Sequence, residues 1–598
     1  MLNIMEKRKN LPIKSLIYLI KMGLNCCKER QNMVKYFMYV LFPFEEEKLT
    51  MDYQKLAELL FPGVTETAEE VEARYPQRDL PEGAKVTRIA PSPTGFMHLG
   101  NLFGAITDER LAHQSGGVFF LRIEDTDAKR AVEGGVETII SVFKKFGLNF
   151  DEGALIDGEK GDYGPYRQRQ RAFLYHVFAK KLVAEGKAYP CFCTEEDLAK
   201  MREQQEAEKA NPGYYGKWAA HRDMPLEEVE KALEEGKSWV LRFRSEGDAE
   251  KYLHLNDLVK GKIDMPENDQ DIVLLKSDGI PTYHFAHVVD DHLLKTTHVV
   301  RGEEWLATWP IHVQLFSALG WKMPKYVHTA QLMKMDGESK RKLSKRKDPE
   351  LALDFYFEEG YPVPSVIEYL LTLLNSNFEE WRLANPKEPY ENFKFTTNKM
   401  SVSGSLFDLD KLRDVSKNVV AMLTTEKVWE YFSEWAEKYD NEFYQLLARD
   451  PEYAKAIISI GRGVPKPRKD IAVWSEMKDY MAFFYDELFV EGKQYPENMS
   501  TEDIASVLKN YVSIYNEQDD QTEWFNRIKE LSVSMGYAAS PKEYKQNPES
   551  FKGHVGDISA VIRMAVTGRV NSPDMFTVMN ILGKEKVTER LEKALNNL

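Results

Sequence analysis

From residue 85 onwards, short apolar runs alternate with longer segments in which apolar residues recur every three or four positions. The runs KVTRIA (85–90) and VFFLRIED (118–125) predict buried strands, whereas residues 101–114 and 134–148 have the apolar spacing of helices. The predicted buried side of the first helix comprises Leu102, Phe103, Ile106 and Leu111. Strands that alternate with helices are typical of a parallel, doubly wound sheet, so we expect an α/β fold of the Rossmann type.

The pattern changes after residue 190. Charged helical segments and short strands predict a domain inserted into the sheet, and the apolar runs at 281–294 and 297–305 predict that buried strands then return. Beyond residue 400 the spacing is helical, for example over 475–488, which predicts an all-helical C-terminal half. The expected units are an N-terminal helix and linker (51–84), two halves of a Rossmann-type domain (85–190 and 280–321), the insertion (191–279), a connecting domain (322–400) and a helical domain (401–598).

Composition bounds the class of protein. At 598 residues the chain is too long for one core, and its 43% hydrophobic and 29% charged residues are ordinary for a globular protein. The net charge of −15 means that any contact with nucleic acid must rest on local basic clusters. Four cysteines are too few for a disulfide framework and favour a reducing cytoplasm, and no apolar run is long enough for a membrane span.

Residues 1–50 are basic and apolar and do not match the chain that follows. They lack the uninterrupted apolar core and the small-residue cleavage site of a secretory signal, while a mitochondrial-type presequence stays open. A new segment begins at Met51 with MDYQKLAELLFPG. We therefore interpret residues 1–50 as an N-terminal extension, with a start site assigned too far upstream as the simplest explanation, and we assign it no function.

The stretch RIAPSPTGFMHLGNLFGA (88–105) joins the first predicted strand to the first helix. Its prolines fix the backbone as it leaves the strand, and Gly100 removes a side chain where a ligand approaches closely. His98 and Asn101 are three residues apart at the helix start, where partial positive charge favours a nucleotide phosphate. A proline-rich loop with an incidental histidine explains the stretch equally well, and the G-x-G-x-x-G pattern of dinucleotide binding is absent.

A second stretch, ESKRKLSKRKDPE (338–350), is strongly basic within an acidic protein. Six of the eight residues at 340–347 are lysine or arginine. A solvated surface loop is one explanation. The other is a mobile loop whose ammonium groups meet the charge that develops on a polyphosphate, with Ser344 as a hydrogen-bonding residue between Lys342 and Lys345.

Together these stretches resemble the paired HIGH and KMSKS signatures of class I aminoacyl-tRNA synthetases. RIAPSPTGFMHLGN, FLRIEDTD, PTYHFAHVVDDHL and VVRGEEW are similar to segments of glutamyl-tRNA synthetases. The resemblance extends to the C-terminus, where residues 563–595 resemble the end of that family's anticodon-binding domain. It implies an enzyme that forms glutamyl-adenylate from L-glutamate and ATP, with Mg²⁺, and then transfers the glutamate to the terminal ribose of tRNA(Glu).

The resemblance also implies roles for individual residues. A glutamate substrate carries two carboxylates and one ammonium group, and therefore needs a pocket rich in arginine that includes one acid. The implied glutamate-binding residues are Arg88, Ala90, Ser92, Glu124, Tyr283, His287, Arg301 and Trp305. The implied ATP-binding residues are His98, Gly100, Asn101 and Lys345. The implied catalytic residues are His98, Gly100, Lys342, Ser344 and Lys345.

Two places depart from the family pattern. His287 stands where the family often has asparagine or a small apolar residue, so contact with the substrate and packing against the sheet both stay open. Cys191, Cys193 and His221 resemble zinc ligands of some family members, but Trp218 stands near the position of the third cysteine. Because structural zinc takes four ligands, we expect two reduced cysteines and no metal.

The candidates for tRNA contact are the insertion, for the acceptor end, and the stretch GRGVPKPRKD (461–470) in the helical half. Its basic residues suit phosphates or base edges, although a charged loop between helices explains them too. The candidate tRNA-binding residues are Arg462, Lys466, Arg468, Lys469 and Arg563. We expect a monomeric, cytoplasmic enzyme that does not contact membranes.

Other functions fit the sequence less well. A glutaminyl-tRNA synthetase is disfavoured by PSPTG and RIEDTD, where that enzyme has a different turn and a DDTN-like segment. A truncated relative that glutamylates a tRNA base, or a generic adenylyltransferase, would not need residues 400–598. The intact signature residues speak against an inactive RNA-binding homologue. Whether tRNA(Gln) is also charged with glutamate cannot be read from the sequence.

Overall fold

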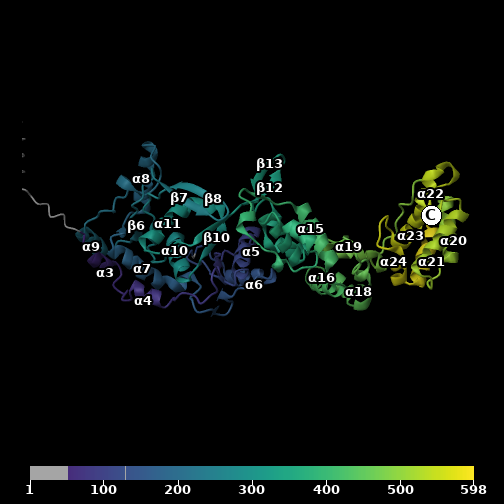
Figure 1. Cartoon of the computed structure of the whole chain (residues 1–598), viewed down its shortest axis with the longest axis horizontal. Helices are drawn as coiled ribbons and strands as arrows, with labels where there is room; N and C mark the ends of the chain where they lie inside the picture. The colour runs from purple at the N-terminus through teal and green to yellow at the C-terminus, as the bar shows by residue number, and fades with distance from the viewer. Residues whose placement is uncertain (1–50, 128) are drawn as a thin grey trace, which may run out of the picture.

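The computed structural model describes residues 51–127 and 129–598. The interpretation of residues 1–50, which include Cys26 and Cys27, lies outside the described residues. The described chain is elongated, with the sheet domain and the insertion at one end and the helices beyond residue 500 at the other (Figure 1). No helix in this part of the chain is long and apolar enough to cross a membrane.

The sheet domain begins with the predicted alternation of strands and helices. Its first strands are β1 (Val86–Ile89), β2 (Val118–Leu121) and β3 (Glu152–Ala154), which are parallel, and β4 (Glu159–Lys160), which is antiparallel at the edge. Its first crossing helices are α5 (Leu99–His113) and α6 (Gly135–Lys145). The four residues predicted for the buried side of α5 are all buried, as are the three apolar residues 119–121 of β2. Parallel strands covered on both faces need such continuous apolar runs.

In the second half of the sheet domain, one of the two predicted strands is a helix. Strand β10 (His298–Gly302) lies beside β1 and pairs in parallel with β11 (Lys325–Thr329), as expected for the run at 297–305. Residues 281–294 contain helix α10 (Tyr283–Leu293), so the strand predicted there is wrong. Helix α10 packs against both α7 (Ala172–Ala184) and α11 (Trp309–Ala318). The buried residues of α10 include the polar His287, Asp290 and Asp291, so its apolar run is short and rich in valine, which favours the prediction of a strand.

Two short helices precede the sheet domain, α3 (Tyr53–Leu60) and α4 (Ala68–Ala73), and both pack on α7. Helix α4 begins with a capping box, in which the backbone N–H of Glu70 donates to the Thr67 hydroxyl and the N–H of Thr67 donates to the Glu70 carboxylate. The sequence TETAEE therefore caps a second helix within the predicted N-terminal helix and linker (51–84).

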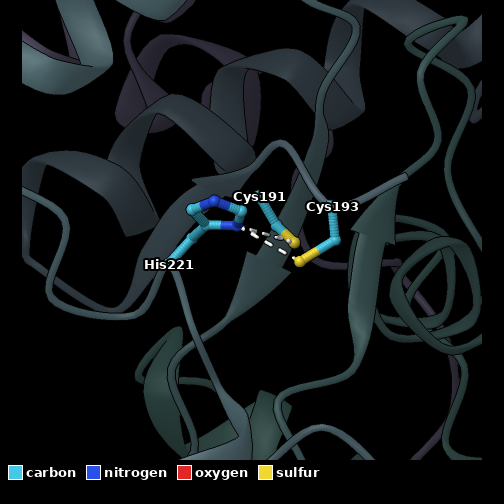
Figure 2. A group of neighbouring side chains, drawn as sticks. All are labelled: Cys191, Cys193 and His221. Carbon is cyan, nitrogen blue, oxygen red and sulfur yellow. Dashed lines mark hydrogen bonds between the residues drawn. The ribbon is translucent and has the colours of Figure 1, made fainter. Parts of the chain in front are cut away.

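The inserted domain is built on a three-stranded antiparallel sheet. The strands are β5 (Ala188–Cys191), β6 (Val240–Phe243) and β9 (Val273–Leu275). The domain is completed by helices α8 (Glu195–Ala207) and α9 (Leu226–Glu234) and by the hairpin of β7 (Tyr252–Asp257) and β8 (Gly261–Pro266). Cys191 and Cys193, at the end of β5, face His221 (Figure 2). The hairpin also contacts the sheet domain, since Leu258 N donates to Tyr326 O of β11.

The connecting domain carries the basic stretch on a hairpin. The strands are β12 (Leu332–Asp336) and β13 (Ser339–Lys342), which are antiparallel, and β14 (Ser405–Leu406), which joins β12 in parallel. The helices are α12 (Leu353–Glu359), α13 (Val363–Leu374), α14 (Phe378–Ala384) and α15 (Leu409–Met422). The predicted loop thus begins as a strand and leaves the hairpin at Lys342.

The prediction of helices beyond residue 400 is wrong for β14 at Ser405–Leu406, and every element after β14 is helical, as predicted. The longer helices are α16 (Thr425–Tyr439), α20 (Thr501–Ile514), α21 (Gln521–Ser534), α23 (Val555–Thr567) and α25 (Lys584–Asn596), and the shorter ones are α17 (Asn441–Leu447), α18 (Pro451–Ser459), α19 (Met477–Met481), α22 (Pro541–Gln546) and α24 (Met575–Leu582). The single helix expected over 475–488 is wrong, because α19 ends at Met481 and a 3₁₀ turn follows. The consecutive aromatic residues 483–485 are all buried, and one face of an α-helix cannot bury three in a row.

Asp108 is an unusual member of the buried face of α5. Its carboxyl group is fully buried, and neither oxygen has a hydrogen-bond partner among the described residues. Burial raises its pKa well above the ordinary value, Arg88 opposes this rise and Asp291 adds to it. The folded protein therefore keeps a proton on Asp108 that the unfolded chain releases above about pH 4. Such a group lowers stability progressively as the pH rises from about 4 towards its folded pKa.

We predict that Asp108→Asn stabilises the protein at pH 7.5 by about 1–3 kcal/mol, because the amide has the shape of the protonated acid and cannot ionise in the unfolded state. The gain should shrink as the pH approaches 4. Thermal and denaturant unfolding measured between pH 4.5 and 8 would check this, with the exposed Asp157→Asn as the matched control. A loss of stability in Asp108→Asn at neutral pH would contradict the prediction.

Candidate active site

The two signature stretches line one cavity of about 500 Å³. It opens at the carboxyl ends of β1 and β10, which is where ligands bind in doubly wound folds. The predicted residues that line it are Arg88, Ala90, Ser92, His98, Gly100, Asn101, Glu124, Tyr283, Arg301, Trp305 and Lys342. The predicted residues that do not line it are His287, Ser344 and Lys345.

The turn between β1 and α5 forms one wall of the cavity. The N–H of His98 donates to Asn101 Oδ1 at 3.0 Å, which fixes the start of α5. The imidazole lies against Gly100, where an added Cβ would stand 3.0 Å from Nδ1, and Nδ1 has no partner among the described residues. Burial lowers the pKa of His98, while Glu304 raises it and Lys342 lowers it. A neutral ring that can donate or accept therefore stands at the mouth of a helix suited to phosphate.

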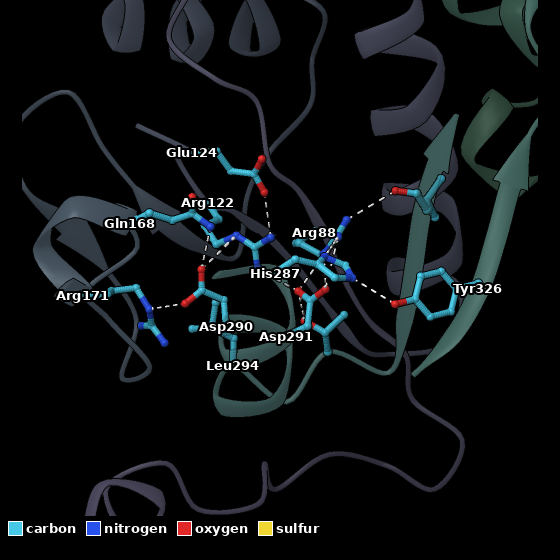
Figure 3. A network of polar contacts seen from close by, with 12 residues as sticks. Arg88, Arg122, Glu124, Gln168, Arg171, His287, Asp290, Asp291, Leu294 and Tyr326 are labelled. Carbon is cyan, nitrogen blue, oxygen red and sulfur yellow. Dashed lines mark hydrogen bonds and ion pairs between the residues drawn. The ribbon is translucent and has the colours of Figure 1, made fainter. Parts of the chain in front are cut away.

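A buried network of arginines and carboxylates lies below the cavity (Figure 3). Asp291 accepts from Arg88 Nε at 3.0 Å and Nη2 at 3.2 Å, and from Arg122 Nη1 at 2.8 Å. Asp290 accepts from Arg171 Nε at 2.6 Å. An unpaired charge in such a place costs several kcal/mol, so each of these groups requires the others. Arg88, predicted to meet a substrate carboxylate directly, is thus already engaged by Asp291.

Sequence reasoning did not single out Arg122, Asp290 and Asp291, although the quoted motifs contain them. The signal was available: two adjacent carboxylates interrupt an apolar run that had been predicted to be buried. Buried carboxylates need cationic partners, and arginine residues stood in the strands predicted to lie nearby. Despite burial, which acts against it, Arg88 and Arg122 hold the pKa of Asp291 below its usual value.

His287 is fully buried and contacts this network. Its Nδ1 lies 3.1 Å from Asp291 Oδ2, and its Nε2 lies 3.0 Å from the Tyr326 hydroxyl. Burial and the neighbouring Arg88 lower its pKa well below the ordinary value, so the ring is neutral. The geometry favours packing beneath Arg88 over direct contact with a substrate.

Glu124 is one of two acids that line the cavity, the other being Glu304. Glu124 accepts from Arg122 Nη2 at 3.0 Å, and burial raises its pKa while the Arg122 charge lowers it. The rings of Tyr283 and Trp305, 4.6 Å apart between centroids, form an aromatic wall of the same cavity. A carboxylate beside aromatic faces suits an ammonium group.

Arg301 differs from the other arginines because no carboxylate among the described residues pairs with it. Its Nε donates to His328 Nε2 at 2.9 Å, and its Nη1 lies 3.0 Å from His312 Nδ1. The remaining nitrogen, Nη2, is buried and has no partner in this part of the chain. A guanidinium with free N–H groups beside a cavity is suited to a ligand carboxylate.

Asp348 joins the loop that follows the hairpin to strand β13. Arg341 donates to it from Nη1 at 2.6 Å and Nη2 at 2.7 Å, and Ser344 N donates to it at 2.8 Å. These contacts with Arg341 lower the pKa of Asp348 to about 2. The Lys345 ammonium lies 3.8 Å from the centre of the Phe96 ring, so it points towards the turn that carries His98.

Two family models match the chain. Residues 85–414 match the catalytic domain of class I tRNA synthetases (E and Q), and residues 424–595 match an anticodon-binding domain. A glutamate–tRNA ligase of Acetivibrio thermocellus is 56% identical over 546 residues, which cover 91% of this chain and 100% of that protein. The chain belongs to the glutamate–tRNA ligase family.

Further relatives of this synthetase agree. A glutamate–tRNA ligase of Clostridium perfringens is 50% identical over 91% of this chain and 100% of its own. The crystal structure of a glutamate tRNA ligase from Elizabethkingia meningosepticum, in complex with its amino acid, superposes with a TM-score of 0.69 and 29% identity, covering 86% of this chain and 99% of that one. The family resemblance and the fold class drawn from the sequence are thereby confirmed.

The residues suggested for tRNA contact in this synthetase separate into two groups. Arg462 turns inward, where Nη1 donates to Val420 O at 2.6 Å and Nε donates to the carbonyl of residue 458 at 2.9 Å. Arg468 is exposed and paired with a neighbouring carboxylate, and Arg563 is partly buried. Lys466 and Lys469 are exposed. Arg462 therefore holds helix ends together, and the exposed cations of the cluster are the ones available to a polyanion.

The Cys191, Cys193 and His221 side chains of the synthetase are closer than their sequence spacing indicated. His221 Nδ1 lies 3.3 Å from Cys193 Sγ and 3.7 Å from Cys191 Sγ (Figure 2). The hydroxyl of Tyr214 also lies within hydrogen-bond distance of both sulfurs. These residues supply three ligands of the kinds that bind zinc, one fewer than a closed structural site takes. A tyrosine hydroxyl is not among the usual zinc ligands, so the absence of structural zinc stays our prediction.

We predict that the purified synthetase contains clearly less than one zinc per chain, because the cluster lacks a fourth ligand. Elemental analysis by mass spectrometry checks this, with a Cys191→Ser/Cys193→Ser variant as the blank. One equivalent of zinc in the wild type that is lost from the variant would contradict the prediction.

Proposed function

We propose that this synthetase activates L-glutamate with MgATP to form glutamyl-adenylate and then esterifies the terminal ribose of tRNA(Glu). The observation that carries the proposal is the charge pattern of the cavity. Two acids, Glu124 and Glu304, line the same space as Arg301, whose Nη2 is buried and unpartnered in the described chain; Glu124 is the one beside the aromatic wall and is proposed to meet the ammonium group. An amino acid whose side chain ends in a carboxylate satisfies Glu124 and Arg301 at once, whereas the amide of glutamine leaves the cation without an anion.

The first step needs no nucleophile from the protein. The α-carboxylate of glutamate attacks the α-phosphorus of ATP in line, a P–O bond forms, and the bond to the leaving pyrophosphate breaks. His98 and Gly100 at the start of α5 are proposed to hold the phosphates, and Lys342 and Lys345 to meet the charge that grows on the pyrophosphate. Mg²⁺ enters with ATP and shares that charge.

The second step joins the amino acid to RNA. A ribose hydroxyl of the terminal nucleotide attacks the activated carbonyl, and AMP leaves with the electrons of the broken C–O bond. The inserted domain contacts strand β11 of the sheet domain through its β7–β8 hairpin, and it is proposed to receive the acceptor end of the tRNA. The helical half, which matches an anticodon-binding domain, would contact the other end through exposed cations such as Lys466 and Lys469.

The decisive experiment is ATP–pyrophosphate exchange with and without tRNA(Glu), comparing glutamate with glutamine. We expect exchange that depends on glutamate and increases when the tRNA is present. Exchange with glutamine alone, or with neither amino acid, would overturn the proposed function. Charging of tRNA(Gln) measured beside tRNA(Glu) would decide whether the enzyme also glutamylates the former.

Lys345→Ala should slow glutamyl-adenylate formation by about 10²- to 10³-fold, because it removes a cation from the developing pyrophosphate charge. The affinity for tRNA, measured by filter binding, should change little. Lys347→Ala is the matched control, since Lys347 is an exposed lysine of the same basic stretch, whereas the Lys345 ammonium lies against Phe96 in the turn that carries His98. A large loss of tRNA binding in Lys345→Ala with normal adenylate formation would assign the basic stretch to RNA contact instead.

A further inference from the structure

The arginines around the cavity are held in two different ways. Arg88, Arg122 and Arg171 each donate to a buried carboxylate of α10. Arg301 instead contacts two imidazoles, those of His328 and His312. A carboxylate orients a guanidinium and also cancels its charge, whereas a neutral imidazole orients it and leaves the charge intact.

The first imidazole has a defined protonation state. His328 and Arg301 are partners in the parallel ladder of β10 and β11, so their side chains leave the sheet on the same face. His328 Nδ1 lies 2.7 Å from Asp257 Oδ2, which assigns the ring proton to Nδ1. The lone pair of Nε2 is then free to accept from Arg301 Nε at 2.9 Å. Asp257 is itself fixed, because three backbone N–H groups donate to it.

The second imidazole belongs to a pair. His312 on α11 presents Nδ1 to Arg301 Nη1 at 3.0 Å, and its Nε2 lies 3.0 Å from Nδ1 of His284 on α10. With Nδ1 accepting from the guanidinium, the proton of His312 sits on Nε2 and is donated to His284. Burial and the nearby Arg301 charge lower the pKa of His284 to about 4 and that of His312 well below the ordinary value. Both rings are therefore neutral at physiological pH.

The two acceptors fix the plane of the guanidinium and leave Nη2 without a hydrogen-bond partner. Arg301 is 8% exposed, and Nη2 is the atom that lacks a partner in the described chain. The ring of Tyr326 lies 4.7 Å from the guanidinium carbon and covers it on one side. The donor groups of Nη2 are thus oriented before a ligand arrives, and the ligand need not displace a carboxylate to reach them.

We propose that His312 and His328 are positioning residues for amino-acid selection, which hold Arg301 through imidazoles so that no carboxylate is bonded directly to its guanidinium and Nη2 is available to the side-chain carboxylate of the substrate. The inference rests on the proposed activation of glutamate. It assigns the preference for an ionised side chain to the kind of acceptor behind Arg301, in addition to the presence of the arginine. The consequence is that a carboxylate placed behind Arg301 should weaken glutamate more than glutamine.

The test uses a pair of variants of equal shape. The Oδ1 of asparagine reaches the position of a histidine Nδ1, so His312→Asn keeps a neutral acceptor, and His312→Asp offers a charged one in the same place. In tRNA-dependent ATP–pyrophosphate exchange, we expect His312→Asn to keep the KM for glutamate within a few-fold of wild type. We expect His312→Asp to raise that KM by about 10- to 100-fold while the KM for ATP stays unchanged.

Glutamine, tested as a competitive inhibitor, gives the readout that a purely structural role would not move. The ratio of the inhibition constant of glutamine to the KM of glutamate should fall at least about tenfold in His312→Asp and stay near wild type in His312→Asn. Equal ratios in the two variants would overturn the inference. Absence of glutamate-dependent exchange in the wild type would overturn the proposed function instead, so the two failures are distinguishable.

A second pair covers the case in which His312→Asp fails to fold, which thermal unfolding would reveal. The Oε1 of glutamine reaches the position of a histidine Nε2, so His328→Gln keeps the acceptor for Arg301 Nε, whereas His328→Leu removes it. His328→Gln should retain a KM for glutamate close to wild type, and His328→Leu should raise it about tenfold or more with the KM for ATP unchanged. Equal effects of the two substitutions, or equal rises in both KM values, would reject the positioning role.

Discussion

The active site is built over the adjacent carboxylates Asp290 and Asp291 on helix α10. They receive Arg88 from β1, Arg122 from the end of β2 and Arg171 from the start of α7, so elements far apart in sequence are joined at one buried point. Removing any member would strand a charge where water cannot reach it, and such a loss costs more than the intact pair contributes. The network therefore fixes the relative placement of the two halves of the sheet domain more strictly than apolar packing alone, which tolerates changes of shape.

The same network divides the cations around the cavity into those paired with carboxylates and those that are not. Three arginines are neutralised by carboxylates beneath the cavity and act as structure, although one of them, Arg88, also lines it. Arg301 and the lysines of the basic stretch (338–350) are the cations that remain available to ligands. Residues at both ends of the turn at 91–101 line the cavity, and the prolines and glycines of that turn set the distance between them.

Much of this arrangement could be predicted from the sequence. Local rules were sufficient for α5, because Leu102, Phe103, Ile106 and Leu111 recur at helical spacing. They were insufficient for α10, whose short apolar run is interrupted by buried polar residues, and for residues 475–488, where consecutive aromatic residues enter the core. The partners of Arg301 were not predictable either. His312 and His328 are separated from it by 11 and 27 residues, and only the register of β10 with β11 and the packing of α11 bring them together.

The β7–β8 hairpin of the inserted domain is connected to the amino-acid site by a chain of side-chain contacts. Strand β7 ends at Asp257, whose carboxylate holds His328, which in turn holds Arg301. The domain proposed to receive the acceptor end of the tRNA thus supplies one end of the chain of contacts that orients the amino-acid site. A displacement of β7 by bound RNA would move this chain of contacts and so alter the affinity for the amino acid. Thermodynamic linkage would then require the bound amino acid to change the affinity for RNA by the same factor.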